Sequence, residues 1–107
     1  MKLYKVLKNG SSCHGGNMTW SLPTGGKPGA WHEETSVEMC KRGLHLTSYP
    51  ETWWVSGCQV YEAETEGPVE GEGTTKVVCK RARLIRQVSL SEYAADRGVS
   101  VRRVVSA

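Results

Sequence analysis

Two segments with the period of a β-strand, joined by a glycine-rich stretch, constrain the fold of this chain most. Gln59–Thr65 alternates apolar and polar residues, and Thr74–Arg86 is a longer segment of the same kind. Gly67–Gly73 between them is typical of a turn. The apolar phase of the second segment slips between Cys79 and Ala82, which predicts a β-bulge. The chain is therefore expected to contain an antiparallel or mixed sheet.

Shorter elements are predicted in the first half of the chain. Leu3–Leu7 predicts a strand that stops at Asn9-Gly10, and Leu44–Thr47 predicts another. Thr35–Arg42 predicts one or two turns of helix that end at a glycine. A sheet combined with short helices and loops rich in Gly, Pro and Trp defines an α+β domain, which is the predicted fold class.

The apolar period changes at Ser89, where a helical pattern begins. Ser89 or Ser91 can cap a first helix, and Gly98 can end it. A second short helix is predicted from Ser100, so the chain is expected to finish in a helical pair. With 107 residues the chain makes one domain. Within it, residues 1–88 are predicted to form the sheet core, and residues 89–107 a helical tail packed on that core.

The aromatic residues are unusual in kind, with four Trp, four Tyr and no Phe. All four tryptophans lie in the first half, among Gly- and Pro-rich stretches. Trp20–Leu22 predicts a brief strand, and Pro50–Ser56 predicts a helical turn. Trp side chains suit both loop anchors and binding surfaces, because they join a large apolar body to a polar handle. Either they anchor the loops, or Trp31, Trp53 and Trp54 line an aromatic groove.

Charge is strongly segregated along the sequence. Residues 1–32 hold four lysines and no acidic residue, whereas residues 33–75 hold nine glutamates and only two basic residues. Residues 76–107 hold eight Lys and Arg against two acidic residues. One interpretation is solvated faces that partly neutralise each other. The other is that the basic last third, including Lys80, Arg81 and Arg83, contacts nucleic acid or an acidic protein.

The four cysteines lack the spacing of a zinc ribbon or a redox pair. They stand at Cys13, Cys40, Cys58 and Cys79, with no C-x-x-C pair. No secretory signal and no apolar run long enough for a membrane span is recognisable, so free thiols and a cytoplasmic protein are expected. A Cys/His metal site assembled in three dimensions is the alternative for the cysteines, but no metal is predicted.

Motifs spread over residues 1–88 resemble a family of small uncharacterised bacterial and phage domains. They are Tyr4–Gly16, Trp20–Pro23, Pro28–Trp31, Cys40–Leu46, Trp53-Trp54, Val60–Glu64 and Lys76–Arg86. The resemblance covers most of the chain. It implies a phage or bacterial accessory protein, and it implies no particular activity.

Residues 89–107 are similar to the helix-turn-helix of DNA-binding proteins. Under this resemblance Arg102 and Arg103 would point at DNA, and Arg97 would lie near a phosphate. The chain departs from the pattern because it stops at Ala107, which leaves a short recognition helix and no third helix. A tail that only packs on the core or docks a partner is the other interpretation.

The stretch from Cys40 to Glu64 loosely resembles the core of ADP-ribosyltransferases. That resemblance implies NAD as cosubstrate and a catalytic set of His45, Glu62 and Glu64, with Trp53 or Trp54 over the nicotinamide. Glu62 and Glu64 are equally well explained as the solvent-facing side of a strand.

The expected function is therefore macromolecular binding by a small accessory protein. The expected partner is nucleic acid or a host protein, for example one that the chain inhibits. The sequence favours a non-enzyme without cofactor or membrane contact, and it leaves the oligomeric state open. The alternative is an NAD-using enzyme similar to ADP-ribosyltransferases.

Overall fold

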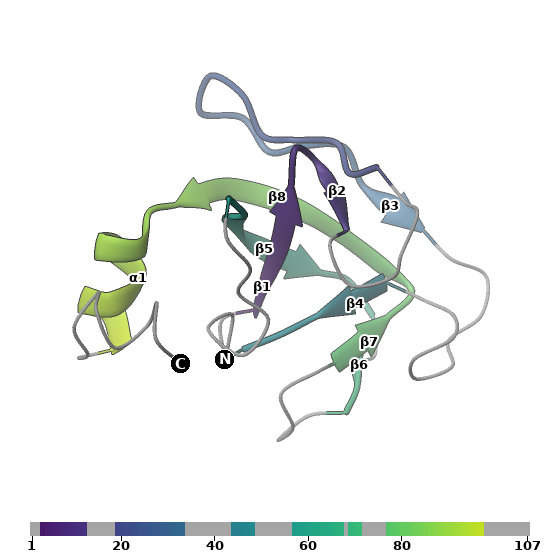
Figure 1. Cartoon of the computed structure of the whole chain (residues 1–107). Helices are drawn as coiled ribbons and strands as arrows, with labels where there is room; N and C mark the ends of the chain where they lie inside the picture. Colours follow the sequence, from purple (N-terminus) through teal and green to yellow (C-terminus); the bar gives the residue numbers. More distant parts are fainter. Residues whose placement is uncertain are drawn as a thin grey trace.

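Strands dominate the computed structural model of this chain, which describes residues 3–12, 19–33, 44–48, 57–67, 69–71 and 77–97. Within these ranges there are eight strands and one helix (Figure 1). The strands are β1 (Leu3–Lys8), β2 (Ser11–Ser12), β3 (His32–Glu33), β4 (Leu44–Leu46), β5 (Gln59–Thr65), β6 (Val69–Glu70), β7 (Val77–Cys79) and β8 (Arg81–Val88). The helix is α1 (Leu90–Arg97).

Five strands form one antiparallel sheet in the order β2-β1-β5-β8-β3. The predicted strands at 3–7 and 59–65 are confirmed, and they pair with each other as β1 and β5. β1 turns into β2 through Asn9 and Gly10, both at positive φ (53° and 80°). A two-residue hairpin turn needs this backbone conformation, and Asn-Gly adopts it readily. The predicted stop at Asn9-Gly10 is therefore confirmed.

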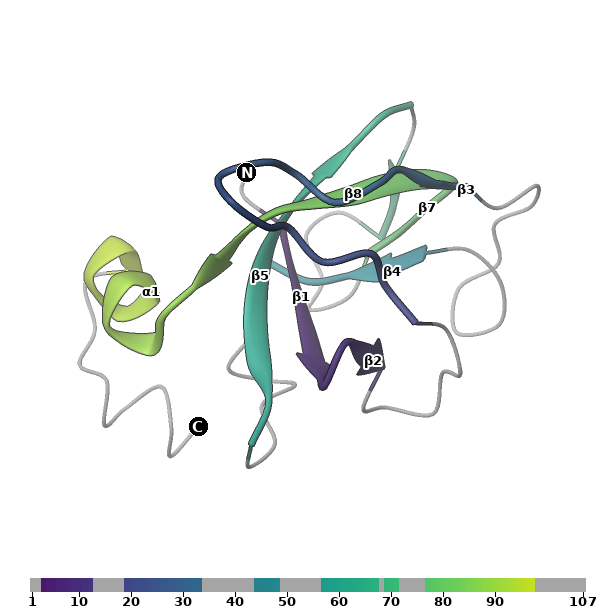
Figure 2. The same ribbon diagram turned by 90° about the horizontal axis from the view of Figure 1, so that it is seen from above.

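A smaller sheet, β4-β7-β6, packs against one face of the larger one. The predicted strand at 44–47 is confirmed as β4, which ends one residue earlier. Thr47 and Tyr4 exchange two backbone hydrogen bonds of 2.7 and 2.9 Å, which link the smaller sheet to β1. β7 and β8 are nearly continuous and bend at Lys80, so one stretch of chain serves both sheets (Figure 2).

The predicted break in the 74–86 segment occurs at the expected place but has a different cause. Cys79 and Ala82 are both buried in the core, with the exposed Lys80 between them. The strand changes sheets there rather than bulging. A pairing irregularity lies further along, where Glu62 pairs with Arg86 and Ala63 with Leu84, so that Ile85 is an extra residue. β6 lies inside the stretch predicted as a turn at 67–73, so that prediction is wrong in part.

The core has two clusters, one on each face of the larger sheet. The first fills the space between the sheets and consists of Leu7, Trp20, Leu44, Leu46, Tyr61, Ala63, Val77, Cys79, Ala82 and Leu84. The second lies between the larger sheet and α1 and consists of Tyr4, Val6, Cys58, Val60, Val88, Tyr93 and Ala94. Cys58 and Cys79 are free and buried, as expected for small apolar residues.

Helix α1 begins where the sequence predicts it. The Glu92 backbone N–H donates a 3.1 Å hydrogen bond to Ser89 Oγ, so Ser89 is the N-cap rather than Ser91. Tyr93 and Ala94 are buried and dock the helix on the sheet. In the part of the chain that is described, no helix has the length and apolar character to cross a membrane.

The predicted α+β class with a C-terminal helical pair is wrong. The described residues are mostly strand, with α1 as their one short helix. The sequence did not predict β3, because this two-residue strand is completed by β8, which lies far away in the chain. The predicted helices at 35–42 and 50–56 and the second tail helix from Ser100 lie outside the described residues.

Candidate functional site

One face of the five-stranded sheet, here called the outer face, is apolar at one end and charged at the other. Tyr61 and Ala63 of β5 point into the first core cluster, between the two sheets, which is here called the inner core. Because side chains alternate along a strand, Val60, Glu62 and Glu64 project from the opposite side of β5. Val60 lies under α1, whereas Glu64 is exposed. The outer face is thus covered at one end and open at the other.

Cross-strand ion pairs line the open end. Arg83 Nη2 lies 3.0 Å from Glu64 Oε2, and Arg83 Nε donates to the same oxygen at 3.1 Å. Arg81 reaches two carboxylates, with Nη1 at 3.1 Å from Glu33 Oε1 and Nε at 3.3 Å from Glu66 Oε1. The pairing of β8 with β3 and β5 brings these residues together, because opposite side chains on antiparallel strands share a face.

Trp31 lies among these arginines. The guanidinium carbons of Arg81 and Arg83 stand 4.5 and 4.6 Å from the centre of its ring, within cation–π range. Trp31 is partly buried, so part of its ring is accessible beside the two arginines. We call the set of Trp31, Glu33, Glu64, Glu66, Arg81 and Arg83 the Trp31 patch.

A hairpin-like segment, residues 19–33, carries Trp31 to the edge of β8 (Figure 2). Its tip is a two-residue turn in which Thr24 and Lys27 exchange hydrogen bonds of 2.9 and 3.1 Å. Returning along β8, Gly29 N–H donates to the Leu84 carbonyl at 2.8 Å, and His32 pairs with Ala82. Residue 31 is therefore placed beside β8 by backbone bonds on both sides of it.

Ser21 ties the two arms of this segment together. The Ser21 hydroxyl accepts a hydrogen bond from the Ala30 N–H at 2.9 Å, and the Ser21 backbone N–H donates one to His32 Nε2 at 3.0 Å. Burial lowers the pKa of His32, which favours the neutral ring that can accept this bond. Gly29 is required for the close approach of the arms, since a Cβ there would stand 2.1 Å from the Ser21 carbonyl oxygen.

The carboxylates of the Trp31 patch are more exposed than its arginines. The side chains of Glu33, Glu64 and Glu66 are 68%, 46% and 65% exposed, whereas those of Arg81 and Arg83 are both 29% exposed. Three carboxylates also outnumber two guanidiniums. The charge that this patch offers to solvent is therefore negative.

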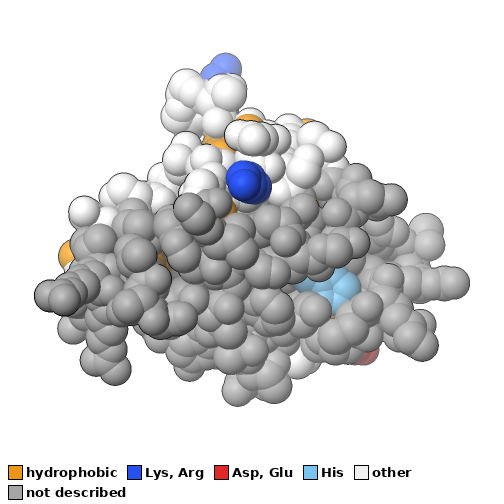
Figure 3. All heavy atoms as spheres, viewed as in Figure 1, with side chains coloured by type: hydrophobic (Ala, Val, Ile, Leu, Met, Phe, Trp, Pro, Cys, Tyr) orange, Lys and Arg blue, Asp and Glu red, His pale blue; other side chains and the backbone are white. Residues whose placement is uncertain are grey.

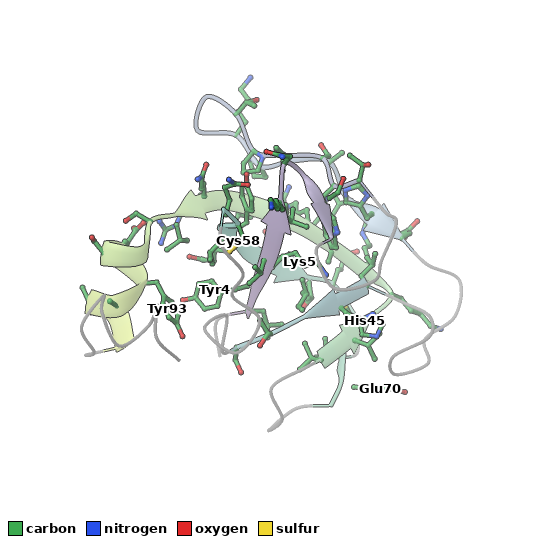
Figure 4. The ribbon with its side chains drawn as sticks, viewed as in Figure 1. Tyr4, Lys5, His45, Cys58, Glu70 and Tyr93 are labelled. Atoms are coloured by element: carbon green, nitrogen blue, oxygen red, sulfur yellow. The ribbon has the colours of Figure 1, made fainter. Side chains whose placement is uncertain are left out.

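Arg86 marks the border between the open and the covered end. Its Nη2 lies 3.1 Å from Glu62 Oε1 on β5, and its Nη1 donates a 2.6 Å hydrogen bond to Glu92 Oε2 on α1. The Glu92 and Glu62 carboxylates raise the pKa of Arg86. Beyond it Tyr4 and Tyr93 meet edge to face, with ring centres 5.3 Å apart (Figure 4). The covered end is thus a packed helix–sheet contact.

The basic residues predicted to contact nucleic acid are placed differently from one another. Arg81 and Arg83 are paired with the chain's own glutamates, whereas Lys80 is exposed and forms no ion pair with a described residue. On the face seen in Figure 3, the Lys and Arg side chains of the described residues form no continuous patch. Arg97 ends α1, and Arg102 and Arg103 lie outside the described residues.

Of the predicted aromatic groove, the structure describes Trp31 alone, because Trp53 and Trp54 lie outside the described residues. Trp20 is instead part of the inner core, with its ring 4.9 Å from that of His32. Lys5 Nζ stands 5.6 Å from the Trp20 ring and donates to the His45 carbonyl at 2.9 Å. The two described tryptophans therefore have different surroundings, one internal and one at the surface.

The residues named for an NAD-using enzyme do not share one face. Leu44 and Leu46 point into the inner core, so the His45 side chain between them points to the far side of the smaller sheet (Figure 4). Glu62 and Glu64 project from the opposite side of the larger sheet, where both bind arginines. The inner core separates His45 from the two glutamates.

No group of three His, Cys, Asp or Glu side chains among the described residues is arranged to hold a metal ion. Burial raises the pKa of the Cys79 thiol to about 11, which keeps it protonated and unreactive. Cys13 and Cys40 lie outside the described residues.

Sequence reasoning missed Glu33 and Glu66 as partners of the basic strand. A signal for the main pairing was present, because Glu62, Glu64 and Glu66 repeat with a period of two, as do Arg81 and Arg83. Pairing these two runs as antiparallel neighbours would have predicted the ion pairs. Nothing in the sequence indicated that Glu33 would reach the same strand.

Residues 1–96 match the model of a protein family described as a domain of unknown function, DUF7666. The match reaches into α1, so the helix that covers the outer face is part of the shared domain. No curated protein and no solved structure matches the chain. Since the matched region is well over half of its length, the chain belongs to the DUF7666 family.

Proposed function

We propose that this chain is a small protein-binding domain and that the Trp31 patch is the surface that engages its partner. The observation that carries the proposal is a partly exposed tryptophan with two arginines within cation–π range, at the end of the sheet over which no described helix lies. Trp and Arg are enriched where protein interfaces gain most of their affinity. An origin in phage or bacteria and action in the cytoplasm belong to the same proposal.

The geometry favours a protein partner over nucleic acid. Phosphate groups need accessible, unpaired cations, because affinity for nucleic acid comes largely from counterion release by Lys and Arg. Arg81 and Arg83 already bind carboxylates, and three glutamates surround them. A phosphate backbone would have to displace those glutamates and accept their repulsion.

A random-peptide display library screened against the immobilised full chain tests this proposal. Peptides should be enriched that lose binding to the Trp31→Ala variant and keep it with Leu22→Ala. Leu22 is the matched control, since it is a large exposed apolar side chain, 38% exposed, outside the Trp31 patch. Leu22→Ala should keep the wild-type free energy of unfolding within about 0.5 kcal/mol. Trp31→Ala loses two cation–π contacts, at roughly 0.5–1 kcal/mol each, and circular dichroism should show that it remains folded.

Two outcomes would overturn the proposal. One is a screen in which no enriched peptide depends on Trp31. The other is tight binding to random duplex DNA that weakens steeply from the lower to the higher of two salt concentrations, which would identify the chain as a nucleic-acid-binding protein.

A further inference from the structure

We infer that the partner of the Trp31 patch presents a basic segment, whose Lys or Arg side chains bind Glu33, Glu64 and Glu66. This inference rests on the proposed function and adds the chemistry of the partner. In the expected complex, cationic side chains of the partner bind the same glutamates that Arg81 and Arg83 already contact within the chain.

The first argument is the depth at which each charge lies. The carboxylates are 46–68% exposed and the guanidiniums only 29% exposed, so an approaching chain meets carboxylates first. A carboxylate has two oxygens and about four acceptor positions, so binding one arginine leaves it able to accept more hydrogen bonds. The glutamates can therefore bind a second cation without releasing the first.

The second argument is the balance of charge over the whole ladder of pairs. Three arginines of β8 face five glutamates once Arg86, Glu62 and Glu92 are included. Among the described residues of this ladder the excess is negative, although the chain as a whole carries a formal charge of +3. A local field opposite in sign to the net charge selects cationic partners at this surface.

The third argument is that two arginines of one strand gather the acidic groups. Arg83 contacts Glu64 through two nitrogens, and Arg81 lies within ion-pair distance of Glu33 and Glu66. An approaching partner therefore meets several carboxylates close together, which strengthens the attraction of a cationic segment. Trp31 adds apolar contact area beside them, which the aliphatic stem of Lys or Arg can cover.

The test uses two synthetic peptides of equal length, one alternating Arg and Ser and the other alternating Glu and Ser, titrated against the full chain. We expect the basic peptide to bind and the acidic one not to bind. Replacing the three glutamates together (Glu33→Gln, Glu64→Gln, Glu66→Gln) should weaken the basic peptide by about tenfold or more. Glu70→Gln, at an exposed glutamate on β6 of the other sheet, is the matched control and should leave its affinity unchanged.

The triple variant should also gain affinity for the acidic peptide. It removes the carboxylates from Arg81 and Arg83, so binding of the acidic peptide should increase in it, while circular dichroism confirms that it remains folded. Preference of the wild type for the acidic peptide, or equal loss with Glu70→Gln, would overturn the inference. Library peptides that depend on Trp31 but are not basic would also overturn the inference, and they would still support the proposed protein-binding function. A library with no Trp31-dependent peptide would overturn both the inference and the proposed function.

Discussion

The two ends of the outer face are built from the same strands and differ in what covers them. At the covered end, Val60 and Val88 pair across β5 and β8 and lie beneath Tyr93 of α1. At the open end of the same pair of strands, Glu64 and Arg83 face each other and no described helix lies over them. The covered end stabilises the fold, because burial of apolar area lowers the free energy of the folded state. The open end adds little to folding stability, because exposed ion pairs contribute little.

The difference indicates that the open end is not maintained for stability. Pairs between exposed Arg and Glu typically contribute about 0–1 kcal/mol each. A second helix or a row of Val and Leu on the same strands would stabilise the sheet more. The paired charges and Trp31 at the open end therefore support the proposed binding role.

The largest expected effect comes from the covered end. Replacing the buried Tyr93 with Ala should cost about 3–5 kcal/mol of unfolding free energy, because it leaves a cavity between α1 and the sheet. Arg83→Ala at the open end should cost less than about 1 kcal/mol. Urea unfolding of both variants measures the contrast, and similar losses in the two would break the division between the ends.

A smaller effect is expected in the segment that carries Trp31. Gly29→Ala forces a Cβ against the Ser21 carbonyl, so the arms must separate at a cost of about 1–3 kcal/mol. Gly25→Asn at the tip is the control, since Asn tolerates its positive φ of 57° and a Cβ there meets nothing within 4 Å. Thermal unfolding should rank the two variants in that order. Equal stability would mean that the arms do not depend on their close approach.

The N-cap of α1 should contribute about 1 kcal/mol. Ser89→Ala removes the acceptor of the Glu92 N–H and weakens the helix that covers the outer face. Ser91→Ala is the matched control within the helix and should have almost no effect. If the two substitutions were equivalent in chemical denaturation, the helix would start elsewhere.

The smallest expected effect is a pH dependence that arises from His32, in the segment that carries Trp31. Burial lowers the pKa of His32 from 6.5, so as pH falls the unfolded chain takes up its proton before the folded one. The contribution of His32 to stability is complete above pH 6.5 and declines as pH falls towards the lower folded pKa. Unfolding free energies measured between about pH 7 and pH 5 should show this slope in the wild type. In His32→Gln the slope should be reduced; an unchanged slope would contradict the role of His32 as a neutral acceptor.

Local patterns predicted the local elements of this fold. The alternation at 3–7, 44–47 and 59–65 and the cap at Ser89 correspond to β1, β4, β5 and α1. These elements are determined by side-chain period and by hydrogen bonds between residues a few positions apart, which are visible in a sequence. The α+β prediction left out the two-residue strands β3 and β6, which are too short to show a period; β3 is completed by the distant strand β8, and β6 by its chain neighbour β7.

The candidate site was predictable in part. Trp31, Arg81 and Arg83 were named, but with the arginines as free cations for nucleic acid. Charge that is segregated along the chain is brought together in space by the antiparallel pairing of β5 with β8. Counting charge by segment cannot show this, because pairing depends on which strands become neighbours.

The bend at Lys80 has a consequence for how the protein is made. The stretch from Val77 to Val88 supplies the middle strand of the smaller sheet and an inner strand of the larger one. A nascent chain that has left the ribosome only as far as β6 lacks both, and its β3 and β4 have no strand to pair with. Residues up to Val88 must therefore leave the ribosome before either sheet can close, and until then the edges of β4 and β5 are open to association with other chains.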